Sequence, residues 1–270
     1  MKNIIITGAS DGIGAEIARQ LARRHGHQAG LVLAARNETL LQQVAGQCRE
    51  HGSEVLVAPT DVTDPAQCRA LIERGVKRFG GIDALINNAG VSAQALFEQV
   101  QPEDLGWYED LMRVNLWGSV WCTHAALPHL KTSRGQLVAV SSLAGLVGVP
   151  GRTAYSASKF AMTGFFEALR AELKPAGVSV TTAFPGVVAT DIRYRGLNAA
   201  GVAAGSSGLK EDKAMPVEVC ARFILDGMER RQREVVMEPR ARIARYLKLI
   251  APGIVEKMAL AALKDEVKPT

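Results

Sequence analysis

The N-terminal segment combines a buried strand, a glycine-rich turn and a helix. Residues 3–7 form an apolar strand-like run, and the turn that follows has the sequence Thr7-Gly8-Ala9-Ser10-Asp11-Gly12-Ile13-Gly14. Apolar side chains at positions 13, 17 and 21 then repeat with helical spacing. Glycines let the backbone approach a pyrophosphate closely, and a helix N-terminus favours its negative charge. This order of elements predicts an α/β fold that binds a dinucleotide at the turn.

The bulk properties limit the class of protein. With 270 residues, the chain is long enough for one large α/β domain with a substantial core. No uninterrupted apolar stretch approaches the length of a membrane span. The four cysteines show neither a CxxC pair nor metal-site spacing, so we expect no metal, and buried thiols in the reducing cytoplasm. The net charge of +5 comes without a nucleic-acid motif, so we expect no nucleic-acid partner.

Strand-like and helical segments alternate along the rest of the chain. We expect further strands at residues 30–35, 54–58, 82–86, 136–141, 178–184 and 234–238, and helices at residues 111–130, 153–173 and 216–231. This alternation predicts one doubly wound, Rossmann-type parallel sheet of about seven strands, with helices on both faces. We assign residues 1–239 to this domain and residues 240–270 to a C-terminal helical extension packed on it.

A second motif carries three side chains suited to acid–base chemistry. Ser142 follows the strand-like run at 136–141, and Tyr155 and Lys159 lie four apart near the start of the helix predicted at 153–173. Residues four apart share one helix face. An ammonium and a helix N-terminus beside a phenol both favour the phenolate. The pair is therefore a candidate acid–base group, although a Tyr and a Lys at this spacing also occur on ordinary exposed helix faces.

The spacing of Ser142, Tyr155 and Lys159, together with the Thr-Gly-x-x-x-Gly-x-Gly turn, resembles the short-chain dehydrogenase/reductase family. The resemblance covers roughly residues 3–238. It implies an oxidoreductase that transfers a hydride between nicotinamide C4 and a carbonyl or secondary alcohol carbon. It also implies four catalytic roles: Tyr155 as general acid or base, Ser142 on the substrate oxygen, Lys159 on Tyr155 and the ribose, and Asn115 on a water relay. The strand order of the family is 3-2-1-4-5-6-7.

The resemblance further implies which residues contact the cofactor. An acidic residue after the second strand would select NAD, whereas the guanidinium of Arg36 can pair with a 2′-phosphate, so we expect NADP(H) in preference to NAD(H). In this respect the chain departs from many NADP-using relatives, which have a basic residue at the position of Asp11. Taken alone, Arg36 could begin an exposed loop, and Asp61 could cap a helix. The implied cofactor contacts are Gly8, Ser10, Gly12, Ile13, Gly14, Arg36, Asp61, Val62, Asn88, Ala89, Gly90, Tyr155, Lys159, Pro185, Gly186, Val188 and Thr190.

The substrate and the assembly are less constrained. Residues 193–212 are rich in Gly, Ala and Ser, which predicts a flexible flap over the site. Its apolar surroundings favour a hydrophobic small-molecule ketone or alcohol, such as a steroid, retinoid or acyl compound. A non-catalytic NADP-binding sensor or scaffold is the alternative. Large apolar side chains at positions 117, 121, 165 and 166 lie on helices through which family members pair, so the resemblance implies a homodimer or homotetramer.

The C-terminal extension combines basic and apolar positions. Four basic residues alternate with an apolar helix face, namely Arg240, Arg242, Arg245 and Lys248 with Ile243, Tyr246, Leu247 and Ile250. Pro252 then breaks the helix, and a second apolar segment follows. These helices could cap the substrate cleft, lie on an anionic membrane, or pack on the body with their arginines solvated. We favour packing and capping over peripheral membrane contact.

Overall fold

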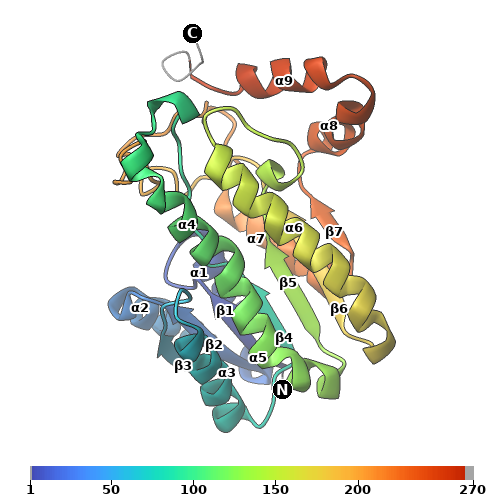
Figure 1. Ribbon diagram of the computed structural model, residues 1–270. Helices are drawn as coiled ribbons and strands as arrows, with labels where there is room; N and C mark the ends of the chain where they lie inside the picture. Colours follow the sequence, from blue (N-terminus) through green and yellow to red (C-terminus); the bar gives the residue numbers. More distant parts are fainter. Residues whose placement is uncertain (1, 265–270) are drawn as a thin grey trace.

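The computed structural model describes residues 2–264, which form one parallel sheet between two layers of helices (Figure 1). The strands are β1 Lys2–Thr7, β2 Ala29–Ala35, β3 Glu54–Pro59, β4 Ala84–Asn87, β5 Gln136–Val140, β6 Ser179–Phe184 and β7 Glu234–Val236. They pair in the order β3-β2-β1-β4-β5-β6-β7, which confirms the predicted single doubly wound sheet. Residues 265–270, which we assigned to the C-terminal extension, lie outside the described residues.

Helices cover both faces of the sheet. The helices are α1 Gly12–His25, α2 Glu38–Glu50, α3 Pro65–Phe79, α4 Gly106–Met112, α5 Gly118–Ser133, α6 Thr153–Leu173, α7 Val217–Glu229, α8 Pro239–Ile250 and α9 Pro252–Ala261. Helices α1, α2 and α7 pack on one face, and α3, α5 and α6 pack on the other. Side chains of β1 alternate between these two cores, with Ile4 and Ile6 on the first and Ile5 on the second. All three are at most 1% exposed, as expected for a parallel strand covered on both sides.

The helix predicted at residues 111–130 is longer than expected and is interrupted. Helix α4 passes into a π-helical segment, Arg113–Trp117, before α5 begins at Gly118. A π-turn holds one more residue than an α-turn and is frequent at functional sites. Asn115 lies at its centre and is fully buried. The ring of Trp117 is 48% exposed and stacks on Trp121, with 5.9 Å between ring centroids.

The predicted flap, residues 193–212, contains neither a long helix nor a long strand in the structure, and short contacts attach it to the body. Leu197 forms a bridge with Ala93, and the indole of Trp107 donates a hydrogen bond to the carbonyl of Ala199 at 3.2 Å. Leu209 forms a second bridge with Leu263, just beyond α9. The flap therefore joins the loop after β4 to the C-terminal extension.

The packing that we expected for helix α8 is reversed. Its apolar residues point to solvent, with Ile243 66%, Tyr246 59% and Ile250 86% exposed. Its basic residues hold it to the body instead: Arg245 pairs with Glu234, and Lys248 donates to the carbonyl of Leu146, with its ammonium 5.0 Å from the ring centroid of Phe160. Arg242 likewise donates to the carbonyl of Val236 at 3.1 Å. The expected packing of Ile243, Tyr246 and Ile250 on the body was wrong. The long side chains of the basic residues can instead reach main-chain carbonyls and a carboxylate, whereas Arg240 is exposed as expected.

Two backbone segments meet very closely where β1 ends. A Cβ placed on Gly14 would lie 2.2 Å from the carbonyl oxygen of Gly8 and 2.4 Å from Nδ2 of Asn88. The same Asn88 Nδ2 donates to the carbonyls of Thr7, at 3.0 Å, and Gly8, at 3.1 Å. The glycine thus permits a contact between the first turn of α1, the end of β1 and the loop after β4.

This contact predicts opposite outcomes for two glycine-to-alanine changes. Gly14→Ala should destabilise the protein by about 1–3 kcal/mol, the usual cost of forcing atoms into a filled space. Gly46→Ala, in α2, has no atom within 4 Å of the added methyl group and should stabilise by about 0.5–1 kcal/mol. Urea unfolding of both variants measures the difference. A Gly14→Ala protein as stable as wild type would contradict the close packing.

Candidate active site

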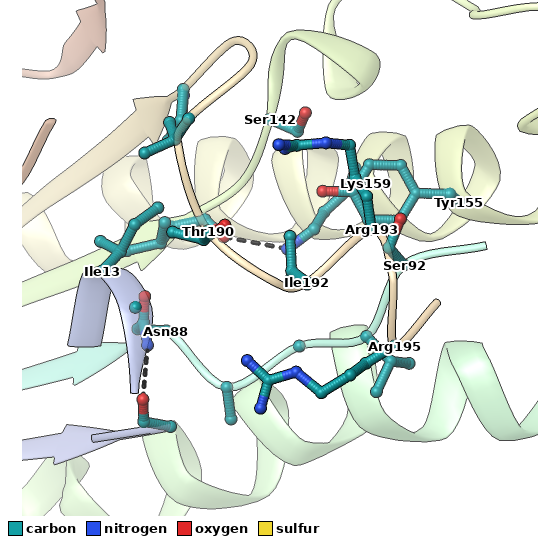
Figure 2. Close-up of a pocket in the computed structure, with 18 of the residues that line it drawn as sticks. Ile13, Asn88, Ser92, Ser142, Tyr155, Lys159, Thr190, Ile192, Arg193 and Arg195 are labelled. Carbon is teal, nitrogen blue, oxygen red and sulfur yellow. Dashed lines mark hydrogen bonds between the residues drawn. The ribbon is translucent and has the colours of Figure 1, made fainter. Parts of the chain in front are cut away.

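A cavity of about 660 Å³ opens at the carboxyl ends of the strands, between the β1 turn, the loop after β4, the flap and α9. In a doubly wound sheet the crevice lies where the strand order reverses, here between β1 and β4. Figure 2 shows the two ends of the cavity, with Ile13, Asn88 and Thr190 toward one and Ser142, Tyr155, Lys159 and Arg193 toward the other.

The glycine turn forms one wall of this cavity. Gly8 and Gly12 have φ values of +65° and +54°, a conformation that favours glycine. Asp11 accepts a hydrogen bond from the amide of Gly12 at 2.6 Å and so caps helix α1. Its other carboxylate oxygen pairs with Arg195 of the flap. On the opposite side, Thr190 approaches the turn, with its Cγ2 3.3 Å from the position of a Cβ on Gly12.

Most of the residues that the sequence predicted for the cofactor and the chemistry line this single cavity. They are Gly8, Ser10, Gly12, Ile13, Arg36, Asp61, Val62, Asn88, Ala89, Gly90, Ser142, Tyr155, Lys159, Pro185, Gly186, Val188 and Thr190. Gly14 and Asn115 are not part of the cavity wall; Gly14 packs against Gly8, and Asn115 lies behind Gly90. Both support residues that do line the cavity.

Arg36 and Asp61 lie near the ends of β2 and β3. The Arg36 side chain is exposed at the mouth of the cavity. Asp61 accepts hydrogen bonds from the amide and hydroxyl of Thr63, at 2.9 and 2.8 Å, and does not cap a helix. The cap of α3 is Asp64, whose carboxylate accepts from the amide of Ala66 at 2.8 Å. These amide bonds hold the pKa of Asp64 below its usual value.

Tyr155 and Lys159 lie in the first two turns of α6 and face the cavity together. They are 8% and 4% exposed, and the Lys159 ammonium is 5.8 Å from the ring centroid of Tyr155. The ammonium donates to the carbonyl of Val140, at the end of β5, at 3.0 Å. Ser142, two residues further along, brings its hydroxyl to the same cavity. Helix α6 and strand β5 thus bring the three predicted side chains together.

Asn115 organises the loop behind the lysine. Its Oδ1 accepts from the amide of Val91 at 2.8 Å, and its Nδ2 donates to the Val91 carbonyl at 3.0 Å and to Oγ of Ser158 at 2.9 Å. Ser158 in turn donates to the carbonyl of Tyr155 at 2.8 Å. The π-turn therefore links the loop after β4 to the first turn of α6.

Burial lowers the pKa of the Lys159 ammonium, and the neighbouring Tyr155 partly opposes this shift. A desolvated ammonium is poorly stabilised by its surroundings, and here it keeps one carbonyl and one sulfur atom, that of Met162 at 3.9 Å, as its hydrogen-bond partners in the described chain. An ammonium has three N–H donors, so one remains for a ligand in the cavity.

Several residues of the cavity were missed by the sequence reading. They are Ser92, Val149, Arg152, Ile192, Arg193, Arg195, Leu209, Glu238, Ala259 and Ala262. Arg152 lies three residues before Tyr155, one helical turn away, and this spacing was an available signal. The others come from loops, from the flap and from the C-terminal extension, where no periodic pattern indicates which side chains point inward.

The fold and the cavity define a dinucleotide-binding α/β protein with a buried tyrosine–lysine pair beside its binding crevice. A family model described as short chain dehydrogenase matches residues 2–198. The chain belongs to this family, the short-chain dehydrogenases/reductases, and is an oxidoreductase acting on alcohols or ketones with a nicotinamide cofactor.

Curated relatives and solved structures agree with this assignment. An 11-beta-hydroxysteroid dehydrogenase A of Sesamum indicum is 36% identical over 261 residues, which cover 94% of this chain and 73% of the relative. An 11-beta-hydroxysteroid dehydrogenase-like protein 4A of Arabidopsis thaliana is 37% identical, with coverage of 94% and 82%. A short-chain dehydrogenase/reductase from Burkholderia phymatum in complex with NAD has a TM-score of 0.79 and 25% identity, covering 94% of each chain. An alcohol dehydrogenase from the archaeon Thermococcus sibiricus, complexed with 5-hydroxy-NADP, has a TM-score of 0.75 and 26% identity, with coverage of 88% and 96%.

Two further structural findings concern the described part of the chain. Across residues 2–264, no group of three or more His, Cys, Asp or Glu side chains is placed to hold a metal ion. Among the helices that the structure describes, none has the length and apolar character needed to cross a membrane.

The burial of Lys159 leads to a prediction about stability. Lys159→Met should raise the free energy of unfolding of the cofactor-free protein at pH 7. Because its folded-state pKa lies below the ordinary value of 10.5, the ammonium destabilises the fold most at low pH, and this cost shrinks as the pH rises toward 10.5. The stability gain of the variant should therefore be larger at pH 7 than at pH 10, measured by chemical denaturation.

The matched control is Lys257→Met, at an exposed position of α9, which should change stability by no more than about 0.5 kcal/mol. A Lys159→Met protein less stable than wild type would show that the hydrogen bond to Val140 outweighs desolvation. A stability gain independent of pH would show that the gain does not come from removing a desolvated charge.

Proposed function

We propose that this protein catalyses NADP(H)-dependent interconversion of a hydrophobic ketone and the corresponding secondary alcohol, with Tyr155 as general acid or base. The observation that carries the proposal is the convergence of Tyr155, Lys159 and Ser142 on one side of a cavity whose other side is a glycine turn. The steroid-dehydrogenase names of the plant relatives support a substrate with a large apolar body.

Several residues that line the cavity are suited to binding a dinucleotide. Gly8 lines the cavity and packs against the loop after β4, where a Cβ on Gly8 would lie 2.8 Å from Cα of Ala89, so the turn presents backbone to the cavity at this position. The pyrophosphate would lie against the turn and the N-terminus of α1, the adenosine near Arg36, Asp61 and Val62, and the nicotinamide near Val188 and Thr190. When bound, the nicotinamide supplies or accepts a hydride at C4.

The chain's own groups supply binding, orientation and proton transfer. In reduction, the Tyr155 hydroxyl gives its proton to the substrate oxygen, and in oxidation the phenolate takes it back. Ser142 donates a hydrogen bond to that oxygen and fixes its position. The Lys159 ammonium stabilises the phenolate charge and binds the ribose hydroxyls. Asn115 holds the Val91 backbone and supports a water path to Lys159.

The remainder of the cavity is suited to an apolar substrate. Its walls beyond the tyrosine include Val149, Val187, Ile192, Leu209 and Ala259. Leu209 belongs to the flap and Ala259 to α9, so the C-terminal extension contributes part of the wall. We therefore assign the extension a capping role over the substrate.

Exposed aromatic rings and buried cysteines bear on the assembly and the location of the protein. Trp117 and Phe160 are 48% and 38% exposed on the π-turn and on α6, and these are the helices through which family members pair. We infer a homodimer or homotetramer. The four cysteines are buried and unpaired in the structure, which supports a reducing, cytoplasmic setting.

A non-catalytic NADP-binding sensor or scaffold is the competing function. It predicts cofactor binding without turnover of any carbonyl compound. The intact set of Ser142, Tyr155, Lys159 and Asn115 argues for catalysis. The decisive measurement is NADPH oxidation against a panel of hydrophobic ketones.

Tyr155→Phe keeps the ring and removes the ionisable hydroxyl. We expect kcat to fall by about 10²–10⁴, the usual contribution of a general acid or base, with cofactor affinity nearly unchanged. The matched control is Tyr246→Phe on α8, which removes an exposed hydroxyl outside the cavity and should retain full turnover. Turnover close to wild type in Tyr155→Phe would refute the role of the tyrosine.

Arg36→Ala tests the cofactor preference. A charge-assisted hydrogen bond contributes about 1.5–3 kcal/mol, so the variant should bind NADPH roughly tenfold to a hundredfold more weakly while NADH affinity changes little. Arg69→Ala removes an exposed guanidinium from α3 and serves as the control. Equal losses for the two cofactors, measured by fluorescence titration, would show that Arg36 does not bind the 2′-phosphate.

A further inference from the structure

Arg152 brings a guanidinium to the catalytic side of the cavity. It precedes α6 by one residue, and its guanidinium carbon lies 4.4 Å from the ring centroid of Tyr155. This is closer to the ring than the Lys159 ammonium, at 5.8 Å. The side chain lines the cavity. Two positive charges therefore lie near the tyrosine ring, and only the lysine has a role in the function proposed above.

The hydrogen bonds of Arg152 leave part of the guanidinium free. Its Nε donates to the carbonyl of Ala93 at 3.2 Å, and its Nη2 donates to the hydroxyl of Ser92. A guanidinium has five N–H donors. Two are used, so three have no acceptor among residues 2–264. The two protein acceptors hold the group in place, since Ser92 is itself 2% exposed.

The charge of Arg152 is not compensated by a neighbouring carboxylate. Among the described residues, no carboxylate oxygen lies within 4 Å of it, whereas the nearby Arg193 is paired with Glu211. Glu238 also lines the cavity, but its carboxylate lies against Gly186 and forms no ion pair with either arginine. Burial lowers the pKa of Arg152, the neighbouring Tyr155 partly opposes this shift, and the positive charge of Arg193 lowers the pKa further.

A desolvated cation without an anion is costly to a fold, and such groups are usually paired or hydrogen-bonded. Arg152 has spare donors, an open side toward the cavity and a fixed orientation. A planar guanidinium matches a carboxylate through two parallel hydrogen bonds. An anion in the cavity would therefore complete the coordination that the protein leaves unfinished.

We propose that Arg152 binds an anionic group of the substrate and that the substrate is a hydrophobic oxo acid or hydroxy acid. The guanidinium is next to Tyr155, so the carboxylate is close to the reacting carbonyl carbon, and the apolar remainder extends toward Leu209 and Ala259. This inference rests on the proposed function and narrows its substrate class from hydrophobic ketones in general to those with a neighbouring negative charge.

The competing explanation is purely structural: Arg152 would hold the segment at Ser92 and Ala93 and stack on Tyr155. In that case, its loss would weaken the binding of charged and neutral ligands alike. Binding of a matched acid and ester distinguishes the two explanations, because the pair differs in charge at one group and shares the carbon skeleton.

The test uses the full-length protein saturated with oxidised cofactor, which cannot reduce a ketone. Isothermal titration calorimetry compares 4-phenyl-2-oxobutanoate with its ethyl ester. We expect the acid to bind about tenfold to a hundredfold more tightly than the ester, the range of a charge-assisted hydrogen bond. Arg152→Gln should remove this difference by weakening the acid alone. Arg240→Gln, an exposed change on α8, controls for the loss of one positive charge.

Two results would overturn the inference: equal binding of acid and ester to wild type, or equal weakening of both in Arg152→Gln. The wild-type comparison stands even if the variant fails to fold. A separate turnover assay of both compounds with NADPH keeps the two proposals apart. Reduction of the ester with no preference for the acid leaves the proposed function intact and contradicts the oxo-acid assignment. Acid-selective binding without reduction of either compound supports an anion site at Arg152 and contradicts the proposed function.

Discussion

The binding crevice depends on how closely two backbone segments approach each other at the ends of β1 and β4. Asn88 ties the carbonyls of Thr7 and Gly8 to the loop after β4, and the absence of a side chain at Gly14 allows α1 to start in the same place. Thr7 adds hydroxyl contacts to the amides of Asn88, at 3.0 Å, and Ala89, at 3.1 Å. The backbone wall of the cavity is rigid for this reason, and the flap and the C-terminal extension are arranged around it.

The other side of the cavity holds a buried ammonium, that of Lys159, and a half-buried guanidinium, that of Arg152. Both lie near the ring of Tyr155, and desolvation disfavours the charged form of each. The fold accepts this cost because hydrogen bonds to main-chain carbonyls of Val140 and Ala93 hold both cations in position. Preorganised charge of this kind needs no rearrangement when negative charge develops, which is the usual arrangement for electrostatic stabilisation in enzymes.

The sequence predicted the sheet well because each buried parallel strand leaves a local apolar pattern, and the glycine turn requires a particular context. It predicted the C-terminal extension poorly. The apolar face of α8 suggested inward packing, but the choice was made by tertiary contacts of Arg245 and Lys248 that no local pattern encodes. Arg152 was overlooked for a related reason. Its proposed role in binding an anion depends on the absence of a nearby carboxylate within the described chain, which is a tertiary feature. The periodicity of the sequence likewise could not show that Asp61 accepts hydrogen bonds within a turn while Asp64 caps α3.

The π-turn around Asn115 limits the insertions and deletions that this part of the chain can accept during evolution. An α-helix rotates by about 100° per residue, so the extra residue of a π-turn sets the angular phase between α4 and α5. Loss of one residue from this turn would give a continuous, regular α-helix. It would also rotate either Asn115 away from Val91 or Trp121 away from its neighbours, depending on which of the two helices rotated. Length variation should therefore be tolerated in the flap but not in this helix, even though part of its surface faces solvent.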